Sequence, residues 1–113
     1  MSDLIASAEP STYKVVLVFH LKPGTADEEL RRSGKPESFP NRLARRPGHL
    51  AMELVKIDED TTMSVQTWKT QSDWWAALEA TKNTQVDSDN RETILVSRDF
   101  FGGTVIRSNL VVA

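Results

Sequence analysis

The chain has 113 residues, which suits a single domain built around one hydrophobic core. Its 14 basic and 16 acidic side chains give a formal charge of −2, and no basic block is long enough to predict nucleic-acid binding. The absence of cysteine excludes disulfides, thiolate metal sites and cysteine nucleophiles.

Neither a membrane span nor a secretory signal is predicted. No apolar stretch approaches the ~20 residues of a membrane helix. The first ten residues, MSDLIASAEP, lack the basic and apolar regions of a signal peptide. We therefore expect a cytoplasmic protein with no membrane partner, in which residues 1–12 form a flexible arm and residues 13–113 form one domain.

The first predicted strand is YKVVLVFHL, from Tyr13 to Leu21, which is rich in β-branched and aromatic residues and ends at a Lys-Pro-Gly turn. Thr25 and Glu28 have the spacing of a capping box, which predicts a helix start. One glycine and two prolines then interrupt the helical sequence. Residues 26–46 therefore predict a broken helical connection.

Two further strands, residues 49–57 and 61–68, flank a polar turn at residues 58–60 and predict a hairpin. Ser72 is expected to cap a helix over residues 73–81.

Residues 83–90 are expected to form a loop. Asp89 and Glu92 repeat the capping-box spacing, so residues 90–100 favour a short helix over a strand. Residues 101–103, Phe-Gly-Gly, are expected to end it, and Thr104 to Val112 form the last predicted strand. The order of elements is that of an α+β, ferredoxin-like split βαβ domain, with a four-stranded antiparallel sheet and helices on one face.

Both faces of this sheet are predicted to be apolar, because alternate side chains of a strand point to opposite sides. On the first strand, Leu17 and Phe19 face one side while Val16 and Val18 face the other. The helices can cover only one face, and the other would expose a large apolar patch. We therefore expect a homodimeric barrel in which two sheets pack together. The alternative is that the N-terminal arm or the extra helix covers the second face.

All three tryptophans lie within eight positions, in SVQTWKTQSDWWAALEA, residues 64–80. Trp74 and Trp75 are adjacent, so they point about 100° apart on a helix and only one can lie at the centre of the core. The cluster marks the place where sheet, helix and any cavity meet.

This stretch, together with RRPGHLAMELVKI before it, resembles the antibiotic biosynthesis monooxygenase domain family of the dimeric α/β barrel superfamily. Some members of that family oxidise flat aromatic polyketides with O2 and with no metal or flavin, in a pocket between sheet and helices. The resemblance implies a small aromatic substrate, no cofactor, and Trp68 at the family's pocket tryptophan. Ser64 stands where quinone-forming members often carry asparagine, and Trp74 stands where an aromatic hydroxyl can sit.

The period of the strand places Ser64 and Gln66 on the same side as Trp68, where their polar groups could orient a phenol or carbonyl oxygen. His20 and His49 are candidates for a base that acts near neutral pH.

Leu17, Phe19 and Trp74 are expected to contact the substrate. Arg107, a charge within the last predicted strand, could bind an acidic substrate or pair with Glu53. The spacings of histidine and carboxylate residues match no metal site, and residues 73–100 contain no histidine that could serve as a haem ligand.

The leading hypothesis is a cofactor-independent monooxygenase. Two alternatives stay open: a non-catalytic dimeric domain that only holds an apolar ligand, and an isomerase or cyclase that uses the same proton acceptor without consuming O2.

Overall fold

Four antiparallel strands form one sheet in the order β2-β3-β1-β4. The computed structural model describes residues 12–82 and 91–107. The strands are β1 (Tyr13–Leu21), β2 (His49–Asp58), β3 (Thr61–Trp68) and β4 (Leu95–Thr104). The helices are α2 (Ala26–Ser33), α3 (Phe39–Ala44), α4 (Gln71–Lys82) and the short 3-10 helix η1 (Arg91–Thr93).

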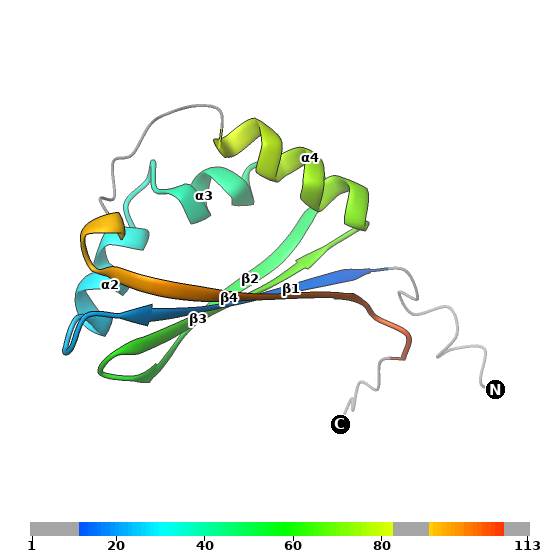
Figure 1. Ribbon diagram of the computed structural model, residues 1–113. Helices are drawn as coiled ribbons and strands as arrows, with labels where there is room; N and C mark the ends of the chain where they lie inside the picture. The colour runs from blue at the N-terminus through cyan, green and yellow to red at the C-terminus, as the bar shows by residue number, and fades with distance from the viewer. Residues whose placement is uncertain (1–11, 83–90, 108–113) are drawn as a thin grey trace, which may run out of the picture.

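Helices α2, α3 and α4 lie on the same side of the sheet, and its other side carries none of them (Figure 1). The predicted ferredoxin-like arrangement is therefore confirmed, as are the first strand, the hairpin and the broken helical connection. The predicted N-terminal arm, the loop over residues 83–90 and the residues after 107 lie outside the described residues.

Two predicted helix caps are wrong. Thr25 stands at the N-cap position of α2, but its side chain accepts no capping hydrogen bond, and its hydroxyl donates to the carbonyl of Lys22 at 2.6 Å. Helix α4 starts earlier than expected because the hydroxyl of Thr70, not that of Ser72, accepts the backbone N–H of Asp73 at 3.0 Å. Helix α3 does have a side-chain cap, since Ser38 accepts the N–H of Asn41.

The last strand is displaced from its predicted position. Residues 95–104 form β4, so the sequence expected to be a short helix is mostly strand, and only η1 is helical. The Phe-Gly-Gly stretch, which was expected to end a helix, lies within β4, where Gly102 pairs with Val15. A side chain at this glycine would collide with the hydroxyl of Tyr13. Gly102 is therefore needed for close packing inside the strand.

Two buried clusters lie between the sheet and the helices, and Leu17 packs against both. The larger contains Tyr13, Val15, Leu43, Trp68, Trp74 and Ala77, and the smaller contains Phe19, Leu21 and Ala26. Trp74 is 2% exposed whereas Trp75 is 46% exposed, which confirms that only one of the adjacent tryptophans enters the core. The space between the two clusters is where a cavity is found.

The helix-free face of the sheet is apolar at its centre. Strand pairing places Val16 between Val65 and Phe101, and it places Val18 beside Met63. Val55 lies next to Met63 on the following strand. We call this set (Val16, Val18, Val55, Met63, Val65, Phe101) the outer patch. Phe101 is 59% exposed, so the chain alone leaves a large aromatic ring of this patch in water.

Candidate functional site

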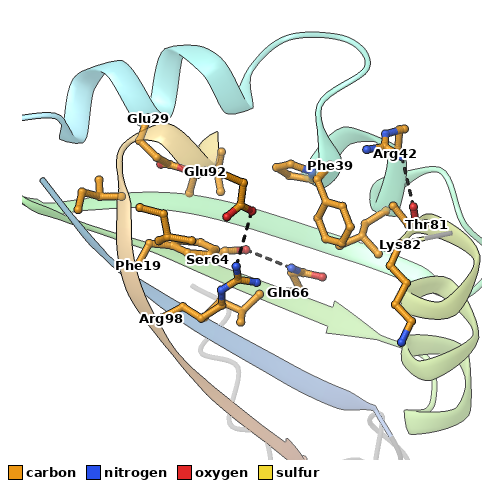
Figure 2. A pocket seen from close by; sticks show the side chains of 16 residues that line it. Phe19, Glu29, Phe39, Arg42, Ser64, Gln66, Thr81, Lys82, Glu92 and Arg98 are labelled. Carbon is orange, nitrogen blue, oxygen red and sulfur yellow. Dashed lines mark hydrogen bonds and ion pairs between the residues drawn. The ribbon is translucent and has the colours of Figure 1, made fainter. Parts of the chain in front are cut away.

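A cavity of about 400 Å³ opens between the helix-bearing face of the sheet and helices α2, α3 and α4 (Figure 2). Its volume lies within the range of ~300–1,000 Å³ that is typical of small-molecule sites. Most of its wall is apolar, and the apolar residues are Leu17, Phe19, Leu21, Phe39, Pro40, Leu43, Leu54 and Leu95.

Strand β3 contributes the polar part of the wall, because every second residue of the strand faces the cavity side. Thr62, Ser64, Gln66 and Trp68 are all buried and occupy alternate positions. The indole Nε1 of Trp68 donates to Oε1 of Gln66 at 2.9 Å, and Nε2 of Gln66 donates to Oγ of Ser64 at 3.2 Å. We call these three residues the polar row; Ser64 and Gln66 line the cavity, and Trp68 lies behind them.

The chemistry of the indole ring fixes the orientation of the Gln66 amide. An indole N–H can only donate, so the amide oxygen must face Trp68 and the NH2 group must face Ser64. The Ser64 hydroxyl accepts from Gln66 and keeps its own proton for another acceptor. The polar row therefore presents hydrogen-bond donors to the cavity.

A buried carboxylate also lines the cavity. Glu29 of α2 is 2% exposed, and its Oε1 accepts a hydrogen bond of 3.0 Å from the hydroxyl of Thr62. Charged neighbours such as those of Glu29 in the sequence are typical of a solvated helix face, yet Glu29 is buried. Its burial follows from the packing of α2 against β3, which the local sequence does not reveal.

Charged side chains also line the cavity. Arg98 of β4 lies 3.8 Å from the carboxylate of Glu92, and both side chains are more than half exposed. Arg42 of α3 donates to the backbone carbonyls of Glu37 at 3.0 Å and Thr81 at 3.3 Å. Figure 2 shows Arg98 and Glu92 together on one side of the cavity and Arg42 on the other.

The predicted site residues divide into two groups. Leu17, Phe19, Ser64 and Gln66 line one cavity. Trp68 supports this wall from behind, with its ring 5.8 Å from that of Trp74 between centroids.

Trp74 is not on the cavity wall. Its ring stacks on Phe100 of β4, with 6.0 Å between the centroids, and so it fills the core beside Trp68.

Neither histidine lines the cavity. His20 points to the helix-free face, where its Nε2 lies 2.9 Å from Oδ2 of Asp99. His49 lies at the start of β2 with its ring edge-on to Trp68, at 5.0 Å between centroids. Its Nε2 is buried with no hydrogen-bond partner among the described residues, and burial lowers the pKa of the imidazole. The geometry does not favour either residue as a base for a ligand in this cavity.

Arg107 lies after the end of β4, where it is exposed and does not line the cavity. Its expected place within the last strand was therefore wrong. The cation that β4 does bring to the cavity is Arg98. Sequence reasoning missed Arg98, because the stretch that contains it was predicted to be helical.

Within residues 12–82 and 91–107, no group of three or more histidine, aspartate or glutamate side chains is arranged to hold a metal ion. The same part of the chain contains no helix long and apolar enough to cross a membrane.

Comparison with known proteins gives matches in structure only. No family model matches the chain, and no curated protein matches it in sequence. SnoaB, a cofactor-independent oxygenase from Streptomyces nogalater, is 14% identical with a TM-score of 0.65, over 88% of this chain and 97% of its own. A candidate antibiotic biosynthesis monooxygenase from Chloroflexus aurantiacus is 13% identical with a TM-score of 0.63, over 90% of this chain and 100% of its own.

A dimeric ferredoxin-like protein from an uncultured marine organism is 11% identical with a TM-score of 0.70, over 96% of this chain and 98% of its own. Identities this low show a shared fold and nothing finer. At that level the resemblance inferred from the sequence is confirmed: the chain has the fold of SnoaB and of antibiotic biosynthesis monooxygenase-like proteins.

Proposed function

We propose that the cavity binds a flat aromatic molecule and that the protein oxidises it with O2 without a cofactor. The observation that carries this proposal is the polar row of β3, whose donors at Ser64 and Gln66 face a cavity of about 400 Å³ with a largely apolar wall. The shared fold with a cofactor-independent oxygenase supports it.

The proposed substrate is a carbon acid such as an anthrone, in which a C–H group lies across a ring from a carbonyl. Loss of the proton leaves an electron-rich anion whose charge spreads onto the carbonyl oxygen. This anion reduces O2 directly, and the balanced products are a quinone and water. Donors fixed in advance around the oxygen stabilise the charge as it develops, because they need no reorganisation during the reaction. Ser64 and Gln66 are assigned this role.

Oxygen uptake tests the proposal. Wild-type protein mixed with anthrone in air should consume O2 above the protein-free blank and form anthraquinone, with no metal or flavin added. The Ser64→Ala and Gln66→Met variants should lower the rate by about 10²–10³-fold, which is typical for the loss of one such donor. Thr67→Val is the matched control, since Thr67 lies on the same strand but faces the opposite side.

Uptake no greater than the blank would reject the oxygenase proposal. If anthrone still raised the melting temperature and came back unchanged, the non-catalytic binding function would take its place. If it came back rearranged without O2 uptake, an isomerase or cyclase would be indicated.

We further propose that two copies pack through the outer patch and form a homodimer. The patch is apolar, lies on the face that the described helices do not cover, and includes the exposed ring of Phe101. A neighbour of the same fold is a dimeric protein, which supports the same arrangement. Light scattering should give twice the 12.7 kDa of one chain.

The variant Phe101→Asp should shift this mass to that of a monomer, because it places a charge in the apolar contact. Trp75→Asp should not shift it, since Trp75 is also an exposed aromatic residue but lies on helix α4, on the other side of the sheet. A wild-type mass of one chain at micromolar concentration would refute the dimer.

A further inference from the structure

Positive side chains outnumber negative ones on the wall of the cavity. The described residues that carry charge there are Arg42, Lys82, Arg98, Glu29 and Glu92. The proposed function uses only the neutral donors of the polar row, so it does not account for this charge. An excess of positive charge around a site favours a ligand that carries an anionic group.

Arg98 is the cation whose position follows directly from the register of the sheet. It pairs with Phe19 of β1, and Phe19 in turn pairs with Thr62 of β3. Because paired residues of neighbouring strands point to the same face, Arg98 projects from the helix-bearing face, on which the polar row also lies. It lines the cavity although its side chain is 53% exposed, so the guanidinium can contact both a ligand and water.

The ion pair between Arg98 and Glu92 is long. Nη2 of Arg98 lies 3.8 Å from Oε2 of Glu92, which is beyond the length of a direct hydrogen bond. Both side chains are more than half exposed, and ion pairs of this kind are weak. A guanidinium carries five N–H donors in a planar fork that matches the two oxygens of a carboxylate. A carboxylate on the ligand could therefore make the short, paired hydrogen bonds that Glu92 does not make.

We propose that the ligand of this cavity is an aromatic carboxylate and that Arg98 binds its carboxylate group. This inference rests on the proposed function, because the same ligand accepts hydrogen bonds from the polar row through its carbonyl oxygen. It names the class of substrate and makes Arg98 the residue that selects it. Binding of an acidic substrate, which the sequence suggested for Arg107, is thus assigned to Arg98.

The separation between the two polar ends of the site suits a flat ring system. Strand β1 lies between β3 and β4, so Ser64 and Arg98 are two strand spacings apart and one step of two residues apart along the strands. With spacings of ~4.8 Å and a step of ~6.8 Å, their Cα atoms lie roughly 12 Å apart. Leu17 and Phe19 of β1 lie between them, and both line the cavity. A ligand packed on these two side chains can present a carbonyl at one end and a carboxylate at the other.

The other two cations on the wall contact groups on the helices. Lys82 lies 3.0 Å from the carboxylate of Glu79 on the same helix, α4. Arg42 donates to the backbone carbonyls of Glu37 and Thr81, and so it links α3 to the end of α4. Figure 2 shows both cations on the side of the cavity away from Arg98.

The binding of two matched ligands tests the proposal. Anthraquinone-2-carboxylate and anthraquinone-2-carboxamide have the same rings and carbonyls and differ in the charge of one substituent. Both are already quinones, so their binding involves neither O2 nor an oxidation step. Isothermal titration calorimetry at pH 7 and low salt should give a Kd about tenfold lower for the carboxylate, as expected for hydrogen bonds to a charged group. Added salt should reduce this difference.

Variants of the ion pair should change the affinity for the carboxylate in opposite directions. Arg98→Gln should raise its Kd by about tenfold and change that of the carboxamide by less than about twofold. Arg98→Lys should give an intermediate value, because lysine keeps the charge but not the planar fork. Glu92→Gln should lower the Kd of the carboxylate, because it removes a competitor for Arg98 and a charge that repels the ligand.

Arg31→Gln is the matched control, because it removes an exposed guanidinium that pairs with Glu28 on α2 and does not line the cavity. Both of its Kd values should equal those of wild type. If the pair of Arg98 with Glu92 had only a structural role, breaking it from either side would affect the two ligands alike. If Arg98→Gln does not fold, Arg98→Lys and Glu92→Gln replace it, and their opposite effects on the carboxylate decide the result.

The proposal is overturned if wild-type protein binds the carboxamide as tightly as the carboxylate, if folded Arg98→Gln keeps the preference, or if neither quinone binds. Its outcome is separate from that of the oxygenase proposal. A preference that Arg98→Gln abolishes, without O2 uptake in the anthrone assay, would keep Arg98 as the selecting residue and reject the oxygenase. Uptake of O2 without a preference for the carboxylate would reject the role of Arg98 alone.

Discussion

Replacing Gln66 with methionine should destabilise the fold by about 2–4 kcal/mol. Methionine has a similar length, but its sulfur is only a weak acceptor for the indole N–H of Trp68, which now donates to Gln66 at 2.9 Å. A buried donor left without a partner costs ~1–3 kcal/mol, and the lost bond to Ser64 adds about 1 kcal/mol. Urea unfolding followed by tryptophan fluorescence, at one fixed protein concentration, measures this difference.

A double-mutant cycle isolates the hydrogen bond. Trp68→Phe removes the N–H, so adding Gln66→Met in that background should cost about 1–3 kcal/mol less than in wild type. Thr67→Val, on the outer side of the same strand, should change stability by less than about 0.5 kcal/mol. A cost below about 0.5 kcal/mol for Gln66→Met, or an unchanged cost in the Trp68→Phe background, would refute the structural role of the polar row.

Three further predictions concern the fold around the site. Gly48 has φ of +90°, and a Cβ there would collide with Asp73. Gly48→Ala should therefore lower the free energy of unfolding, measured in urea, by roughly 2–5 kcal/mol through backbone strain and overpacking together. A change within experimental error would contradict this. Gly102→Ala should lower stability by about 1–3 kcal/mol through its collision with the hydroxyl of Tyr13, and Tyr13→Phe should relieve part of that loss if the collision is the cause. Burial lowers the pKa of His49 below 6.5, so the unfolded chain takes up the proton first as the pH falls. The free energy of unfolding should therefore decrease as the pH drops below about 6.5. In the His49→Phe variant this decrease should be smaller when urea unfolding is compared at several pH values.

The face of the sheet to which each strand residue points was predictable from the sequence, because side chains alternate along a strand. In β3 the alternate residues Thr62, Ser64, Gln66 and Trp68 are buried, and in β1 the buried residues Tyr13, Val15, Phe19 and Leu21 all lie on one face of the strand. The same period placed Ser64 and Gln66 beside Trp68 on one face. The hydrogen bonds that join them follow from that placement, because neighbours two apart on one face are within reach of a long amide.

The misplaced β4 shows where local sequence is insufficient. The capping-box spacing of Asp89 and Glu92 favoured a helix, and the two consecutive glycines favoured the end of that helix. Pairing with β1 outweighs both signals. Glycine is needed at position 102 because a side chain there would collide with Tyr13, which comes from a distant part of the chain.

Glu29 was missed for a related reason. Asp27 and Glu28, which directly precede it in the helical sequence, suggest a solvated acidic face. Glu28 does lie there, where hydrogen bonds from Arg31 and Arg32 lower its carboxyl pKa to about 2. Only the docking of α2 against β3 distinguishes Glu29 from its neighbours.

The three groups that begin at the Trp68 indole align head to tail: each one is a donor to the next, and the series ends at the Ser64 hydroxyl proton. Aligned dipoles of this kind polarise one another, so the terminal member is a stronger donor than an isolated serine. A mutation that removes the indole N–H of Trp68 should therefore weaken the hydrogen bond from Ser64 to the carbonyl of the proposed ligand, although the indole does not contact that ligand.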